Sequence, residues 1–146
     1  MPSLRLSDFK IGKLLGAGSF GEVHRAREKN KKDDVVIKSI AIVGVSRKEQ
    51  ESALNEVKLL AKLDHPRVCR YYASFVEDEK LRIVMQYCEG GDLRRHIETR
   101  QKAKQPFSAD NVWRFLAQAA HGLAHLHEHK ILHRDLKSSN LFLTRV

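Results

Sequence analysis

Three short motifs occur in one order along this 146-residue chain and constrain its fold more than any other feature. They are the glycine-rich segment GAGSFGEV (residues 16–23), the apolar segment VVIK (residues 35–38) and the polar segment HRDLKSSN (residues 133–140). The first two supply groups that bind phosphate, namely backbone N–H groups left open by glycine and a lysine ammonium. The third supplies an aspartate and an asparagine, which suit a hydroxyl proton and a metal ion, beside a second lysine. The set predicts a site for phosphoryl transfer.

The first motif fits the pattern G-x-G-x-x-G through Gly16, Gly18 and Gly21. The pattern alone is weak, because a glycine-rich turn without any ligand has the same composition. The residues after Gly21 favour a returning strand, so we expect a hairpin whose N–H groups cover phosphates. A Rossmann fingerprint needs a helix at this point, and a Walker loop needs lysine where Glu22 stands.

The second motif ends in Lys38, which an apolar strand would hold at the edge of the interior. A helix is expected downstream, because Ser46 and Glu49 form a capping box ahead of apolar residues at helical spacing. Those apolar residues are Ala53, Leu54, Val57, Leu60 and Ala61. Glu56 lies near this apolar face, where a carboxylate needs a cation, and Lys38 is the expected partner.

The third motif has the form H-R-D-x-x-x-x-N and is the most specific of the three. Asp135 provides a carboxylate that can accept a hydroxyl proton, and Asn140 provides an amide oxygen for a metal ion. Lys137 can neutralise charge on a phosphate in transfer. A surface loop would explain any one of these residues, but it does not explain the set.

Strand-forming segments and turn signals predict an α+β fold in two parts. Five short strands are expected at 9–15, 23–27, 35–40, 69–75 and 81–86. After the Gly90-Gly91 pair the pattern becomes helical, with Asp92 as N-cap for 93–100 and Ser108 as N-cap for a longer helix with a wide apolar stripe between Val112 and Leu126. We place the boundary between residues 1–88 and 89–146.

These motifs make the chain resemble the first part of a eukaryotic protein kinase domain, from about Phe9 to Leu143. The resemblance implies a kinase-like, five-stranded antiparallel N-lobe with one helix, followed by the first helices and catalytic loop of a truncated C-lobe. It implies ATP and Mg²⁺ as cofactors. The catalytic residues it assigns are Lys38 and Glu56 as the activating ion pair, Asp135 as base, Lys137, and Asn140 as metal ligand.

The segment 83–93 (IVMQYCEGGDL) resembles the hinge of the NIMA-related kinases, as do residues 131–137 and 140–144. This resemblance implies a serine/threonine kinase. It assigns nucleotide contacts to Leu15, Gly16, Gly18, Gly21, Val23, Val36, Lys38, Met85, Gln86, Cys88, Asp92 and Phe142. Two residues depart from the family pattern: Val36 stands where alanine is usual and would tighten the adenine pocket, and Gln86 replaces glutamate at a backbone contact.

An Asp-Phe-Gly metal-binding element does not occur in the 146 residues. Without its aspartate a second metal contact is lost, and electrostatic stabilisation is usually the largest catalytic contribution. We therefore expect the 146-residue chain alone to be inactive. The alternative function is a catalytically inactive fragment that binds nucleotide or acts as a regulatory module. The apolar stripe also predicts poor solubility.

Composition limits partners and location only loosely. The formal charge of +9 suits anionic ligands, although a solvated basic surface explains it equally well. Lys29, Lys31 and Lys32 precede two aspartates without interleaved aromatics, so no nucleic-acid partner is expected. Cys69 and Cys88 lie far apart in sequence and indicate neither a disulfide framework nor a C-x-x-C metal or redox site. His121 with His125 lacks further ligands at metal spacing.

The chain has no apolar segment of membrane-spanning length and no signal-like start. We therefore expect an intracellular, cytoplasmic protein without a membrane partner. The expected partners are ATP and protein substrates that carry serine or threonine. Cytoskeletal partners, and a cytoskeletal or nuclear location, follow only from the subfamily resemblance.

Overall fold

The computed structural model describes residues 4–18 and 21–144, with the side chain of Glu56 excepted. The chain forms two compact units, one of Met1–Asp64 with Arg70–Tyr87 and one of His65–Cys69 with Cys88–Val146. No helix in the described part of the chain is long and apolar enough to cross a membrane.

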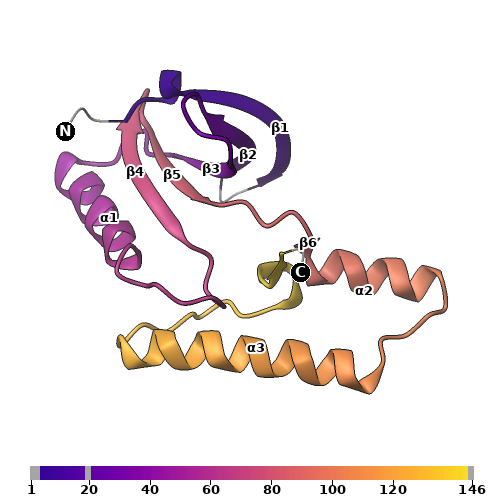
Figure 1. Cartoon of the computed structure of the whole chain (residues 1–146). Helices are drawn as coiled ribbons and strands as arrows, with labels where there is room; N and C mark the ends of the chain where they lie inside the picture. The colour runs from indigo at the N-terminus through magenta and orange to yellow at the C-terminus, as the bar shows by residue number, and fades with distance from the viewer. Residues whose placement is uncertain (1–3, 19–20, 145–146) are drawn as a thin grey trace. The chain divides into compact units, whose positions relative to one another are not determined.

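The first unit is a five-stranded antiparallel sheet with a 3-10 turn, η1 (Leu6–Asp8), and one helix, α1 (Arg47–Leu60) (Figure 1). Its strands are β1 (Phe9–Gly18), β2 (Gly21–Glu28), β3 (Asp34–Ala41), β4 (Tyr71–Glu77) and β5 (Lys80–Gln86). The strand order is β1-β2-β3-β5-β4. The predicted five-stranded sheet is confirmed, but β4 begins at Tyr71, so the prediction that Cys69 and Arg70 belong to this strand is wrong.

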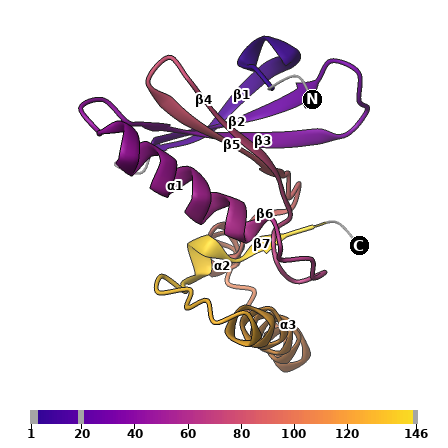
Figure 2. The ribbon, with the colours of Figure 1, turned by 90° about the vertical axis from the view of Figure 1, so that its left-hand side faces the viewer.

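The two faces of this sheet are covered differently. One face carries a buried cluster of Phe9, Ala26, Ile37, Phe75 and Val84. The other carries Ile42, Leu81 and Ile83, and α1 packs on it through Ala53, Leu54 and Val57. Figure 2 shows α1 lying beside the sheet. The predicted capping box at its start is present, with Ser46 and Glu49 bonded to each other.

Leu60 and Ala61, the last two residues of the predicted apolar stripe on α1, do not share this burial. Leu60 remains 39% exposed, and Ala61 is the C-cap of the helix. The helix is therefore packed on the sheet through the apolar residues of its middle turns.

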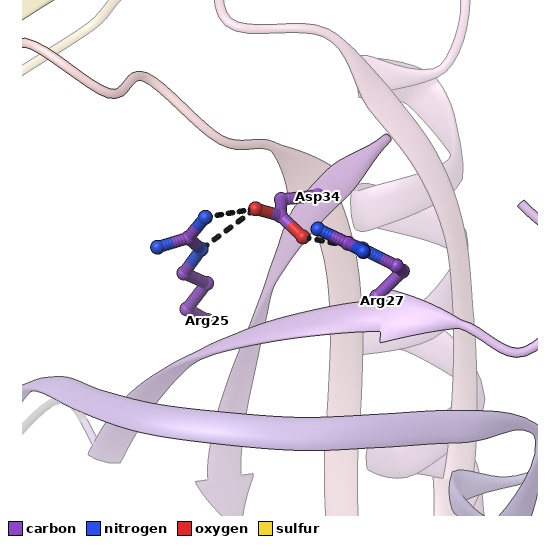
Figure 3. A network of polar contacts seen from close by, with 3 residues as sticks. All are labelled: Arg25, Arg27 and Asp34. Carbon is purple, nitrogen blue, oxygen red and sulfur yellow. Dashed lines mark hydrogen bonds and ion pairs between the residues drawn. The ribbon is translucent and has the colours of Figure 1, made fainter. Parts of the chain in front are cut away.

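An ion-pair network joins β2 to the start of β3 (Figure 3). The carboxylate of Asp34 accepts hydrogen bonds from Arg27 Nε at 2.8 Å and from Arg25 Nε at 2.8 Å. These bonds, first that of Arg27, lower the pKa of the Asp34 carboxyl. The guanidinium carbon of Arg25 also lies 4.9 Å from the ring centre of Tyr87. The network joins the two strands of the β2–β3 hairpin, although exposed pairs of this kind contribute little stability.

The second unit contains α2 (Leu93–Lys102), α3 (Ala109–Glu128), the short turn η2 (Ser138–Asn140) and a two-stranded sheet of β6 (Gly91–Asp92) and β7 (Phe142–Leu143). Both predicted N-caps are present: Asp92 accepts a hydrogen bond from Arg95 N–H and Ser108 accepts one from Asn111 N–H. Several residues of the predicted apolar stripe on α3 stay exposed to solvent. Val112 is 53% exposed and Leu116 is 56% exposed.

The segment His65–Cys69 packs against α3 within this unit. A Cβ at Gly122 would lie 2.7 Å from the carbonyl oxygen of Arg67, so only glycine permits this approach. The His65 ring stacks on the His125 ring with their centres 4.9 Å apart, and the ring centres of His125 and His129 are 4.5 Å apart. Among the described residues no group of three or more potential ligands could hold a metal ion.

Candidate phosphate-binding and catalytic sites

The glycine-rich motif forms the tip of the β1–β2 hairpin. Gly18 pairs with Gly21 and Gly16 with Val23, so the predicted return strand is present. Ser19 and Phe20 lie outside the described residues. Gly21 has φ +101°, and a Cβ there would meet the carbonyl oxygen of Ser39 at 2.1 Å. Gly21 therefore lets the hairpin lie close against β3, which a larger residue would prevent.

Replacing Gly21 by alanine should destabilise the first unit by about 2–5 kcal/mol, since positive φ and a backbone clash act together. Chemical denaturation followed by circular dichroism measures this loss. Gly16→Ala is the matched control, because no atom of the described residues lies within 4 Å of a Cβ at that position. Equal stability of the two variants would contradict this account of the hairpin.

Cross-strand pairing places Val36 and Lys38 of the second motif on the same sheet face as Val23 of the hairpin's return strand. Val23 pairs with Lys38, which pairs with Ile83, and Val36 pairs with Met85. Directly paired residues share a face of an antiparallel sheet, as do residues two apart. Lys38 is half-buried on this face, between apolar neighbours. One sheet face therefore collects Val23, Val36, Lys38 and Met85.

Helix α1 packs on this same face. Ile83, which is paired with Lys38, belongs to the cluster that α1 covers through Ala53 and Val57. Residue 56 lies within α1, next to Val57, but its side chain is outside the described part of the structure. The backbone arrangement thus brings the helix that carries Glu56 onto the face that carries Lys38.

The third motif forms a closed polar loop in the second unit. Asn140 Nδ2 donates to the backbone oxygen of Asp135 at 2.8 Å and to its carboxylate at 3.0 Å. Lys137 Nζ lies 3.1 Å from the other carboxylate oxygen. Hydrogen bonds with Lys137 and Asn140 lower the pKa of the Asp135 carboxyl. Asp135 is therefore ionised at neutral pH and its orientation is fixed by the two neighbours.

The backbone around Asp135 is also constrained. Arg134 has φ +62°, a conformation that few residues other than glycine adopt, and it turns the chain sharply ahead of the aspartate. The N–H of Asp135 donates to His133 Nδ1 at 3.2 Å. Strain at a non-glycine residue persists only where surrounding contacts hold it, and such residues concentrate at functional sites.

Contacts with β6 and α2 anchor the end of this loop. Gly90 N–H donates to the Leu143 oxygen at 2.8 Å and Leu93 N–H to the Leu141 oxygen at 2.8 Å. These bonds join Gly90 and the first residue of α2 to residues 141–143, which directly follow Asn140. No sequence pattern predicted this sheet, although the Gly90-Gly91 pair is typical of a close backbone approach. A Cβ at Gly90 would lie 2.5 Å from the Leu143 oxygen.

The remaining predicted nucleotide contacts are divided between the two units. In the first unit Leu15 on β1 is 45% exposed and Gln86 ends β5. In the second unit Phe142 on β7 is 55% exposed and pairs with Asp92, while Cys88 is half-buried. The Asp92 carboxylate is already used as the N-cap of α2, where it accepts a hydrogen bond from Arg95 N–H.

The sequence matches the family model of the protein kinase domain over residues 9–146. The chain therefore belongs to the protein kinase domain family. This assignment confirms the fold and family that the motifs predict, and protein kinases in general use ATP and Mg²⁺.

Within the family the chain is similar to the Nek serine/threonine kinases. It is 42% identical to serine/threonine-protein kinase Nek5 of Mus musculus over 140 residues, which is 96% of this chain and 21% of that protein. It is 41% identical to Nek1 of Mus musculus over 90% of this chain and 11% of that protein. Nek11 of Macaca fascicularis is 39% identical over 92% of this chain and 22% of its own length. The chain thus spans about a fifth of Nek5.

Proposed function

We propose that the protein transfers the γ-phosphate of ATP to serine or threonine hydroxyls of other proteins. The observation that carries this proposal is the loop in which Lys137 and Asn140 hold the Asp135 carboxylate at 3.1 and 3.0 Å. The similarity to Nek serine/threonine kinases supports the choice of hydroxyl substrate. The cytoskeletal partners and intracellular location inferred from the subfamily stay predictions.

In the proposed mechanism Asp135 accepts a hydrogen bond from the substrate hydroxyl and takes its proton as the oxygen attacks phosphorus. A carboxylate with a lowered pKa is a weak base, so its main contribution is to orient the hydroxyl. Lys137 lies beside the carboxylate and can move its ammonium group to the transferring phosphate, where negative charge is concentrated.

Asn140 fits a magnesium ligand, because its Nδ2 is used by Asp135 and its amide oxygen remains as a hard donor. Bound Mg²⁺ would neutralise phosphate charge during transfer. The protein's own contribution at this point is to fix the amide orientation through the two hydrogen bonds to Asp135.

We assign nucleotide binding in the first unit to the glycine hairpin and to the sheet face that carries Lys38. The hairpin supplies backbone N–H groups for phosphate, and Lys38 supplies a positive charge on an apolar surface, where charge is weakly screened. Val23, Val36 and Met85 share that face and provide apolar surface for adenine. Leu15, Gln86, Cys88, Asp92 and Phe142 are the further contacts we propose.

Isothermal titration calorimetry of the 146-residue chain with ATP and Mg²⁺ tests the first step of this function. We expect saturable binding of one nucleotide that EDTA weakens, because metal chelation removes the ion that screens the phosphates. GTP is the matched control for adenine recognition. Absence of ATP binding by a folded chain would overturn the proposal. Binding without phosphotransfer in a longer protein that also carries an Asp-Phe-Gly segment would favour the regulatory alternative.

A further inference from the structure

Two thiols that the proposed function does not use as reacting groups lie together in the second unit. Cys69 and Cys88 are the two cysteines of the whole chain. They lie 19 positions apart in sequence (88 − 69), yet their side chains are hydrogen-bonded to each other. Neither thiol is in a disulfide in the structure.

The backbone explains why they meet. Just beyond the last β4–β5 pair, Tyr71 with Met85, Gln86 N–H donates to the Arg70 oxygen at 2.8 Å, and the Gln86 side chain accepts from Arg70 N–H at 3.2 Å. Cys69 directly precedes Arg70, and Cys88 comes two residues after Gln86. The antiparallel pairing therefore delivers both cysteines to the same end of the ladder.

The two thiols differ in their surroundings. Cys69 is exposed, and Cys88 is half-buried. The hydrogen bond from Cys69 lowers the pKa of the Cys88 thiol, against the opposing effects of its burial and of the Glu89 carboxylate. A lowered pKa gives Cys88 a larger thiolate fraction than an unperturbed thiol has, which suits it as the attacking nucleophile, and Cys69 stands beside it as a resolving thiol.

We propose that Cys69 and Cys88 are a redox pair that closes a reversible intramolecular disulfide when it meets a hydroperoxide. In the first step the Cys88 thiolate attacks one peroxide oxygen and the O–O bond breaks. Cys88 becomes a sulfenic acid, and the leaving hydroxide takes up a proton to form water.

In the second step the Cys69 sulfur attacks the Cys88 sulfur. The S–O bond breaks, the hydroxyl leaves with the Cys69 proton as a second water, and the S–S bond forms. Two thiols and one hydrogen peroxide thus give one disulfide and two waters, with two electrons passed to the peroxide. A dithiol reductant reverses the reaction by thiol–disulfide exchange.

Treatment of the folded 146-residue chain with limiting hydrogen peroxide tests the pair. Intact mass spectrometry should show the loss of two hydrogens in a monomer, and peptide mapping should place the bond between Cys69 and Cys88. Dithiothreitol should restore the original mass. The same chain in denaturing urea is the control for proximity, and we expect disulfide formation there to be at least ~10-fold slower, because loop closure must then occur by chance.

Two serine variants separate the roles of the thiols. In Cys69→Ser the sulfenic acid on Cys88 should persist and be trapped by dimedone, because no resolving thiol is present. In Cys88→Ser dimedone labelling should be severalfold slower, since the exposed Cys69 lacks the same activation. The proposal is overturned if folded wild-type chain gives intermolecular dimers or over-oxidised cysteines in place of the internal disulfide, or if urea does not slow the reaction.

Discussion

Replacing Lys38 by methionine should lower phosphotransfer by ~10²–10³-fold, the range found when one charge-stabilising group is removed from an active site. Methionine keeps the length and apolar stem of lysine and removes only its charge, so the sheet face with Val23 and Ile83 stays packed. The assay uses a protein that carries residues 1–146 together with an Asp-Phe-Gly segment, and measures radioactive phosphate transferred to a serine/threonine protein substrate.

The matched control for this prediction is Lys31→Met. Lys31 lies in the turn between β2 and β3, where its side chain is 67% exposed and pairs with Glu28, and nothing assigns it to the site. Its loss should leave phosphotransfer unchanged. If Lys38→Met and Lys31→Met have equal activity while both remain folded, the assignment of the sheet face as the phosphate site is wrong.

Much of the first unit follows from local sequence signals. Strand-forming residues between charged turns give β1, β2, β3 and β5 to within a few residues, and the Ser46–Glu49 box gives the start of α1. The pairing of β3 with β5 is less local, because β3 and β5 are separated by α1 and β4. That pairing was not predicted, because periodicity alone does not determine strand order.

The missed elements depend on contacts that are distant in sequence. Strands β6 and β7 have two residues each and lie about fifty positions apart, so no periodic pattern marks them. The same holds for Cys69 and Cys88, which lie far apart in sequence and form no recognisable motif. Their contact depends on where the β4–β5 ladder ends. Composition identifies the reactive groups, and only the fold shows which of them lie together.

In the catalytic loop, by contrast, the spacing of the residues in sequence already predicts which side chains meet. Asp135 and Asn140 are five positions apart, and the short turn η2 brings the amide to the carboxylate. The positive φ of Arg134 could not be predicted, because the sequence has no glycine or asparagine there to signal it. Surrounding contacts, such as the bond from Asp135 N–H to His133, hold that conformation in place.

Replacing Asp135 by asparagine should lower phosphotransfer by ~10²–10⁴-fold, the usual contribution of a general base, while the affinity for ATP stays unchanged. An amide has the shape of the carboxylate but cannot take the hydroxyl proton or orient it with a negative charge. Because Asp135 and Lys137 are 64% and 56% exposed, losing their ion pair should not alter the melting temperature.

Asp33→Asn makes the same chemical change in the exposed turn before β3 and serves as the control for this second prediction. Measuring ATP affinity and transfer rate separately distinguishes the two sites: Lys38→Met should lower both, and Asp135→Asn only the rate. Full transfer in the Asp135 variant would remove the observation on which the proposed function depends. A loss of ATP affinity equal to that of Lys38→Met would instead mean that the loop acts on nucleotide binding and not on the substrate hydroxyl.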